Sequence, residues 1–330
     1  MVTRALNVGG AESICQPGRP LLPCRGGGLI ISNRCRVRRA DGRREKAVIA
    51  IVSTRFQEKA KKRPRRGQEE ERRVRPIIIG AGRGSRLKAL TDEQPKSYAS
   101  VGDRRILDWL LEALAGTGMD TPVFIGGYQI DMIRADYPQL SYCHNHDWPN
   151  NNILASLFCA EEHMSDGFVC TYADILYRSS VVQRALEHEG DIVLCVDVDW
   201  RRRYFERSQH PEQDAEKVLA DGDRVTRIDR QISSAQATGE YIGVAKFSPD
   251  GAAWIREHYH RIRQGFAGRQ WKGGTTFEKA YLIHLFEEML DQSVSFYMVT
   301  TDGEYMEIDT EQDYALANER WPREFGGIDH

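Results

Sequence analysis

A glycine-rich segment between residues 75 and 96 constrains the fold more than any other part of the chain. It reads R-P-I-I-I-G-A-G-R-G-S-R-L-K-A-L-T-D-E-Q-P-K. The apolar run Ile77–Ile79 indicates a buried strand, which breaks at once into a turn with three glycines. Glycine permits positive φ and a close approach of the backbone to a ligand, and successive backbone N–H groups in such a turn form a concavity that suits phosphate. The segment therefore predicts a polyphosphate-binding loop after a first strand.

Two common glycine motifs do not describe this loop. A Walker A loop requires G-x-x-x-x-G-K-[ST], and no such string occurs in the chain. A Rossmann fingerprint requires G-x-G-x-x-G, but counted from Gly80 the third glycine comes one position early. On the glycines alone, a plain turn between a strand and a helix remains an alternative. The charges of Arg83, Arg86 and Lys96 favour phosphate binding instead.

The segment G-A-G-R-G-S-R-L followed by Q-P-K resembles the signature of the nucleotidylyltransferases that activate sugar phosphates, phosphocholine and phosphonates. The usual first residue of that signature is Ala, where this chain has Gly80. The resemblance implies that Arg86 and Lys96 bind the triphosphate and stabilise the departing pyrophosphate. It also implies a nucleotide-binding loop made of Gly80, Ala81, Gly82, Arg83, Gly84 and Ser85.

Strand-like and helix-like segments alternate along the rest of the chain. Apolar residues recur at helical spacing over 106–114. Further helices are expected at 128–135, 252–262 and 276–290 and after Thr310, and a polar loop is expected to follow position 200. Strands are expected at 122–127, 141–145, 167–172, 191–199, 215–219, 225–228, 240–247 and 295–300. This order predicts a three-layer α/β sandwich with a mostly parallel, Rossmann-like mixed sheet, and the resemblance implies its glycosyltransferase-A-like form.

Three later motifs extend the resemblance. They are H-P-E-Q-D-A-E-K-V, G-E-Y-I-G-V-A-K-F-S and M-E-I-D-T-E-Q-D, and they look like those of cytidylyltransferases acting on phosphocholine and small phosphonates. The similarity is collinear over about residues 76–320. It implies that Asn151, Asn152 and Ser156 lie beside the nucleotide base, although asparagine here could simply cap a helix. It also matches Lys217 to the lysine that binds the substrate phosphate, although this residue could be a solvated hairpin position.

Two carboxylates far apart in the sequence fit a magnesium site. Asp174 follows the strand at 167–172, at the strand end where α/β sheets bind ligands. Mg²⁺ accepts one or two carboxylates together with waters and phosphates. The resemblance places metal ligands at Asp174 and at Asp309 of E-I-D-T, although Asp309 taken alone could belong to the first turn of the last helix.

The acceptor pocket is expected near Asp199, Trp200, Glu240 and Tyr241, since aromatic faces and carboxylates together suit an ammonium group. Ordinary packing is an alternative for these residues. The arginines at 201–203 leave open an anionic acceptor as well.

Charge is distributed unevenly along the chain. Residues 1–75 contain 20 Lys and Arg against 7 Asp and Glu, whereas the remainder contains 26 against 41. The basic segment 1–74 is expected to be a disordered leader, with a nucleic-acid arm or a transit peptide as alternatives. We hypothesise that the working protein begins near Val74. A single domain is then expected over 75–325, with acceptor-binding insertions around 198–247, and its acidic charge disfavours nucleic acid.

Seven cysteines form no C-x-x-C pair, which favours reduced thiols in a cytoplasmic protein. No apolar run approaches the roughly 18 residues that a membrane span requires.

The reaction predicted is Mg²⁺-dependent transfer of CMP from CTP to a small phosphonate or phospho-alcohol, such as aminoethylphosphonate or phosphocholine, with release of pyrophosphate. The attacking phosphate oxygen is already anionic, so positioning and charge neutralisation suffice and no general base is needed. Two alternatives are a sugar-1-phosphate nucleotidylyltransferase using UTP, dTTP or GTP, and a nucleotide-binding regulatory protein without catalysis. The sequence does not indicate an oligomeric state.

Overall fold

The computed structural model describes residues 37–38, 44–45 and 74–325. The chain divides into two compact units, Met1–Gly67 and Gln68–His330. In the first unit, β1 (Val37–Arg38) pairs antiparallel with β2 (Arg44–Glu45). Most of the basic leader lies outside the described residues. The second unit contains the sheet and the candidate site.

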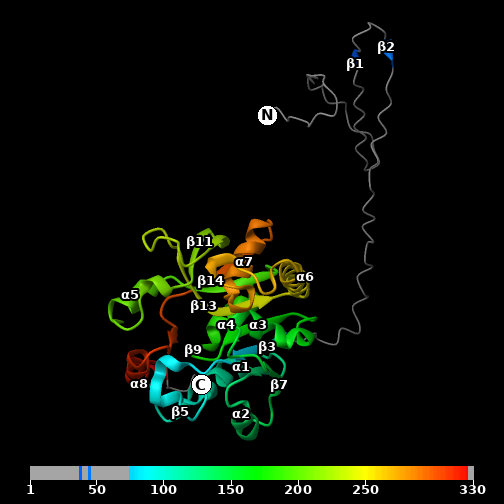
Figure 1. Cartoon of the computed structure of the whole chain (residues 1–330). Helices are drawn as coiled ribbons and strands as arrows, with labels where there is room; N and C mark the ends of the chain where they lie inside the picture. Colours follow the sequence, from blue (N-terminus) through cyan, green and yellow to red (C-terminus); the bar gives the residue numbers. More distant parts are fainter. Residues whose placement is uncertain (1–36, 39–43, 46–73, 326–330) are drawn as a thin grey trace, which may run out of the picture. The chain divides into compact units, whose positions relative to one another are not determined.

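The second unit is built on a nine-stranded mixed sheet with the order β10-β14-β12-β11-β13-β8-β3-β6-β7 (Figure 1). Pairing is parallel along β8-β3-β6-β7 and between β10 and β14, whereas β13 runs antiparallel to β8, β10 and β11. The hairpin β11–β12 is antiparallel, so β13 and β12 oppose the other strands. The predicted mixed α/β sheet is confirmed. The strands are β3 (Arg75–Gly80), β6 (Val123–Gly126), β7 (Ser141–His144), β8 (Phe168–Tyr172), β10 (Ile192–Asp197), β11 (Lys217–Asp221), β12 (Arg224–Ile228), β13 (Gly239–Phe247) and β14 (Phe296–Thr301).

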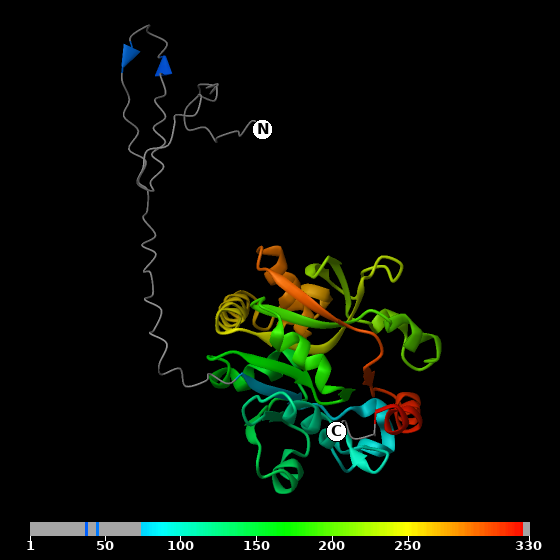
Figure 2. The same ribbon diagram turned by 180° about the vertical axis from the view of Figure 1, so that it is seen from behind.

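Helices cover both faces of this sheet (Figure 1, and Figure 2 from behind). Side chains alternate across a strand, so Ile78 of β3 packs with one set of helices while Ile77 and Ile79 pack with the other. The first set is α1 (Ile106–Ala115), α2 (Ile130–Asp136) and α4 (Ser179–Glu187). The second set is α3 (Ile153–Leu157), η3 (Phe158–His163), α6 (Pro249–Phe266) and α7 (Leu282–Asp291). The result is a helix–sheet–helix sandwich.

The register of the parallel strands creates a common carboxyl edge. Gly80 of β3 lies opposite Gly126 of β6, and Ile79 lies opposite Tyr172 of β8. The glycine loop and the segment containing Asp174 therefore leave the sheet side by side. Ligands of open α/β sheets bind at this kind of edge.

A smaller layer brings the end of the chain to the same edge. Strand β9 (Ile175–Tyr177) pairs antiparallel with β15 (Tyr305–Glu307), and the N–H of Ile308 donates to the carbonyl of Asp174 at 3.1 Å. Helix α8 (Glu311–Phe325) then packs on the segment after the glycine loop (Figure 1). The remaining short elements are η1 (Ser85–Thr91), η2 (Lys96–Tyr98), β4 (Ser100–Val101), β5 (Arg104–Arg105), η4 (Glu212–Asp214), η5 (Lys272–Gly274) and η6 (Phe277–Lys279).

Two local predictions were wrong. The expected polar loop after position 200 begins with the helix α5 (Trp200–Phe205), because Trp200 and Tyr204 share one helical face and pack on Ala215. The helix expected from position 276 begins only at Leu282. Residue Phe277 is instead buried in η6, where it packs against Tyr259 of α6.

Among the helices of the described ranges, none combines the length and the apolar character required to cross a membrane. The cysteines of the same ranges are free thiols, with Cys143, Cys170 and Cys195 buried and Cys159 half-buried.

Candidate active site

A pocket of about 480 Å³ lies at the carboxyl edge of the sheet. Its walls come from the glycine loop, η2, the start of α3, the end of β8, β13 and the segment after β15. The structure brings most of the predicted site residues together here, although their roles remain predictions. Those that line the pocket are Gly80, Ala81, Gly82, Gly84, Arg86, Lys96, Asn151, Asn152, Ser156, Asp174, Glu240, Tyr241 and Asp309.

Five predicted site residues do not line this pocket. Arg83 forms an ion pair with Asp92 at 2.6 Å, and Ser85 is exposed at the start of η1. Lys217 is buried in β11, where its Nζ lies 3.4 Å from each of two backbone carbonyls and burial lowers its pKa. Asp199 is exposed, and Trp200 is buried at the start of α5.

Neighbouring side chains leave no room for a Cβ at two glycines of the loop. Gly84 has φ +70°, and a Cβ there would lie 2.7 Å from Cδ of Lys96. A Cβ on Gly80 would lie 2.6 Å from the ring of Phe124 and 2.8 Å from Cβ of Ala173. Glycine at position 80, where the family signature usually has Ala, therefore lets this strand end pack closely on Phe124.

Lys96 lies between the two predicted metal ligands. Its Nζ donates to Oδ2 of Asp174 at 2.7 Å and also to Oδ1 of Asp309. Burial opposes the charge of Lys96, but the two carboxylates outweigh burial and raise its pKa. Arg86 donates to the second oxygen of Asp309 at 2.5 Å. The site therefore holds fixed positive charge beside the glycine loop.

The carboxylates of the site differ in their ionisation. Burial alone would raise the pKa of Asp309, but Lys96 and Arg86 bring it below its usual range. Burial and the charge of Asp309 raise the pKa of Glu307 well above its usual value. The carboxyl group of Asp309 therefore ionises more readily than that of Glu307.

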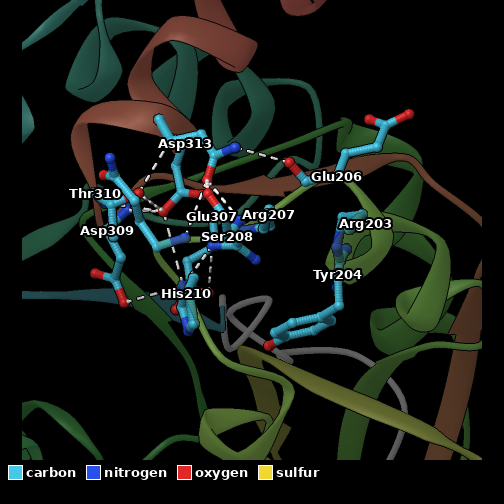
Figure 3. A network of polar contacts seen from close by, with 12 residues as sticks. Arg203, Tyr204, Glu206, Arg207, Ser208, His210, Glu307, Asp309, Thr310 and Asp313 are labelled. Atoms are coloured by element: carbon cyan, nitrogen blue, oxygen red, sulfur yellow. Dashed lines mark hydrogen bonds and ion pairs between the residues drawn. The ribbon is translucent and has the colours of Figure 1, made fainter.

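A buried polar network supports Asp309 from behind (Figure 3). The carboxylate of Asp313 accepts from the N–H groups of Asp309 at 3.1 Å and Thr310 at 2.8 Å. Arg207 donates through Nε to the other oxygen of Asp313 at 2.6 Å and lies 2.5 Å from Nδ1 of His210. His210 stands in the motif H-P-E-Q-D-A-E-K-V, but neither this residue nor Arg207 was predicted to be a site residue.

Two groups of side chains within the described ranges have the composition and spacing to hold a metal ion. One is His210, Glu307 and Asp309, whose ligand atoms lie within 4.8 Å of one another inside the pocket region. The other is Cys143, Glu162 and His163, which lies apart from the pocket residues.

The start of α3 is organised by a residue that the sequence did not indicate. Asn145, at 2% exposure, donates to Oδ1 of Asn151 at 2.8 Å and to Oγ of Ser156 at 2.9 Å. The side chain of Asn151 donates back to Asn145 at 2.9 Å. Asn152 accepts from the N–H of Ile153 at 2.8 Å and so caps the helix. The available signal was only that Asn145 follows β7 at the same sheet edge.

On the expected acceptor side, the carboxylates of Glu240 and Glu216 are paired with arginines. Both oxygens of Glu240 are occupied, one by Arg203 and the other by the hydroxyl of Tyr204 at 2.6 Å. A second ion pair in the pocket wall joins Arg230 to Glu216 at 3.1 Å. Neither member of that pair was predicted as a site residue, although Glu216 stands in the motif A-E-K-V.

The chain belongs to the family described as the MobA-like NTP transferase domain. The profile of that family matches residues 76–259, which are more than half of the chain. The protein is thus a nucleotidyltransferase.

Three similar proteins carry names that specify cytidylyl transfer. The chain is 25% identical to the CTP:phosphoglutamine cytidylyltransferase of Campylobacter jejuni, over 74% of this chain and 99% of the relative. It is 27% identical to the 2-aminoethylphosphonate cytidylyltransferase of Lancefieldella rimae, over 28% of this chain and 40% of the relative. The solved CTP:phosphocholine cytidylyltransferase of Streptococcus pneumoniae shares the fold, with a TM-score of 0.57, 22% identity and coverage of 75% of this chain and 98% of the other.

Proposed function

We propose that this protein is a Mg²⁺-dependent cytidylyltransferase. It transfers CMP from CTP to a small acceptor that carries a phosphate or phosphonate, and it releases pyrophosphate. The observation that supports the proposal best is Lys96, held between Asp174 and Asp309 against the glycine loop. The names of the similar proteins add support, since all three are cytidylyltransferases.

The carboxylates fit a magnesium ion. Asp174 and Asp309 both reach one cationic atom, the Nζ of Lys96, so their oxygens already converge on a positive charge. Carboxylate oxygens are the protein ligands that Mg²⁺ prefers. Asp174 and Asp309 would hold the ion, which would neutralise charge on the triphosphate.

The side chains orient the substrates and neutralise charge in this reaction. An acceptor oxygen forms a bond to the α-phosphorus of CTP. The bond between that phosphorus and the oxygen that bridges it to the β-phosphorus breaks, and the electron pair of the broken bond leaves with pyrophosphate. The acceptor oxygen is already anionic, so no proton has to be removed. Lys96 and Arg86 counter the negative charge that accumulates on the leaving group. The glycine loop and the start of α3 hold the triphosphate and the base in the orientation that the attack requires.

Pyrophosphate release by the purified full chain tests the proposal. Each of CTP, UTP, dTTP, GTP and ATP is combined with a panel of phosphoamino acids, phosphocholine, aminoethylphosphonate and glucose-1-phosphate. We expect CTP to exceed the other nucleotides by about tenfold or more in kcat/KM and chelation by EDTA to abolish turnover.

A matched pair of lysine variants tests the site itself. Lys96→Met should lower kcat/KM by about 10²-fold or more because it removes charge at the transferring phosphates. Lys88→Met is the control, since Lys88 is exposed and pairs with Glu311. No release with CTP and any acceptor contradicts the proposal. Turnover of UTP with glucose-1-phosphate would instead indicate a sugar nucleotidylyltransferase, and CTP binding without turnover would indicate a regulatory protein.

A further inference from the structure

We propose that Arg230 binds a carboxylate of the acceptor, so that the acceptor is a phosphorylated amino acid or a close derivative of one. This inference rests on the proposed function only in taking the pocket described above as the acceptor pocket. It assigns a specificity-determining residue that lies outside the sequence motifs.

Arg230 is held in a fixed orientation in the pocket wall. One end of its guanidinium pairs with Oε1 of Glu216 at 3.1 Å. Its Cζ lies 3.9 Å from the centroid of the Tyr281 ring, so the planar group is stacked on an aromatic face. Two contacts of this kind fix the guanidinium fork before a ligand arrives, which is the arrangement that favours recognition of a planar carboxylate.

The guanidinium still has hydrogen-bonding capacity. The hydrogen bond to Glu216 uses Nη2. Arg230 lines the pocket and its side chain keeps 27% of its surface exposed, so a bound carboxylate can reach the N–H groups of the guanidinium that face the pocket.

Glu216 connects this pair to the reacting end of the pocket. Its second oxygen lies 3.3 Å from the hydroxyl of Tyr172, and Tyr172 lies two residues before Asp174. All of these residues line one pocket. A small acceptor can therefore present its phosphorus group near Asp174 and its other end to Arg230.

The charges select between two classes of acceptor. Glu240, the carboxylate expected to attract an ammonium group, is already paired with Arg203. An acceptor that carries an ammonium group without a carboxylate would offer no anionic partner to the exposed part of Arg230. A phosphorylated amino acid would present its carboxylate to Arg230, which gives the guanidinium a second anionic partner beside Glu216. The similar protein aligned over 99% of its length is named for phosphoglutamine, which also derives from an amino acid.

Titration calorimetry with two matched ligand pairs tests this inference. O-Phosphoserine and phosphoethanolamine differ only in the carboxylate, and O-phosphohomoserine and 3-aminopropyl phosphate repeat the comparison with one more methylene. Each ligand is titrated into the full chain with Mg²⁺, with and without a non-transferable α,β-methylene analogue of CTP. We expect the carboxylate-bearing member of at least one pair to bind about tenfold tighter.

The variant Arg230→Gln should reduce that preference to about twofold or less and should leave the affinity for the amine-only ligand unchanged or higher. Arg227→Gln is the matched control, because Arg227 stands on β12 with a half-exposed side chain paired to Asp229. The single variant leaves the carboxylate of Glu216 without its arginine partner. If it fails to fold for this reason, the double variant Glu216→Gln/Arg230→Gln removes that carboxylate as well and takes its place in the test.

Three outcomes would overturn the inference. They are equal binding within both ligand pairs, equal weakening of both members in the variant, and no binding of either carboxylate-bearing ligand. Calorimetry requires no turnover, so a protein that fails to use CTP can still show the carboxylate preference, and one that uses CTP can still lack it.

Discussion

Lys96 shows how burial and charge together define this site at the scale of single residues. A buried lysine without partners tends to lose its proton, but Asp174 and Asp309 keep Lys96 charged. A buried ion pair contributes little to stability by itself, although breaking one is costly. The position of Lys96, Asp174 and Asp309 beside the glycine loop therefore explains their clustering better than a contribution to folding does.

Asp313 offers a test of the supporting network through pH. Burial would raise its pKa, but hydrogen bonds and charges from His210 and Arg207 lower it below its ordinary value of 3.8. A carboxylate with a lowered pKa contributes stability above the unfolded value and loses that contribution as pH falls toward the folded value. Asp313→Asn should therefore cost about 3 kcal/mol of unfolding free energy between pH 5 and 7, and the cost should shrink below about pH 4.

Urea unfolding followed by tryptophan fluorescence measures this difference. The control is Asp223→Asn, since Asp223 is exposed and faces His188 across 3.2 Å, and it should change stability by about 0.5 kcal/mol or less. A cost for Asp313→Asn that stays constant down to pH 3 would show that the ionised carboxylate is not what stabilises the network.

At the scale of elements, the glycine loop and η2 behave as one unit because Gly84 packs directly on the side chain of Lys96. The loop residues and the lysine follow one another in the sequence signature, yet only the structure shows that they touch. The position of the lysine thus depends on the absence of a side chain at residue 84.

Gly84→Ala should lower the rate of pyrophosphate release by about tenfold or more, because the added methyl group displaces Lys96 and misplaced groups slow the reaction steeply. Gly222→Ala is the matched control. Gly222 has a similar φ of +61°, but no atom lies within 4 Å of its added Cβ. Both variants should lose about 1–2 kcal/mol of stability from the left-handed backbone. Equal activities of the two would contradict a direct role for the contact.

Helix α5 explains why the acceptor residues were harder to predict than the nucleotide loop. The segment reads as a polar run with aromatic interruptions, and its arginines could face solvent or ligand. In the structure Arg203 turns inward to Glu240 and Asp197. That pairing joins α5 to the end of β10 and to the distant strand β13, so no local pattern in the sequence indicates it.

At the scale of the whole molecule, the site requires both ends of the second unit. Pairing of β15 with β9 carries Asp309 to Asp174, and α8 closes the same region over the segment that follows the glycine loop. The described contacts of the site all lie within Gln68–His330.

A shortened chain of residues 74–330 should therefore retain the melting temperature within about 2 °C and the rate of pyrophosphate release within about twofold. Differential scanning calorimetry and the release assay, run beside the full chain, provide the measurements. A shortened chain that is inactive or unfolded would show that the unit Met1–Gly67 is required.

The sequence by itself determined most of the strands and helices, the glycine loop and the family, because these depend on local periodicity, turn chemistry and collinear motifs. It also singled out Lys96, Asp174 and Asp309, whose convergence the structure then showed. Only the tertiary structure decided the partners of Glu240, the support from Asn145 and Asp313, and the place of Arg230 in the pocket. These features depend on side chains meeting across elements distant in the chain, where packing and burial determine which charges are paired and which remain available to a ligand.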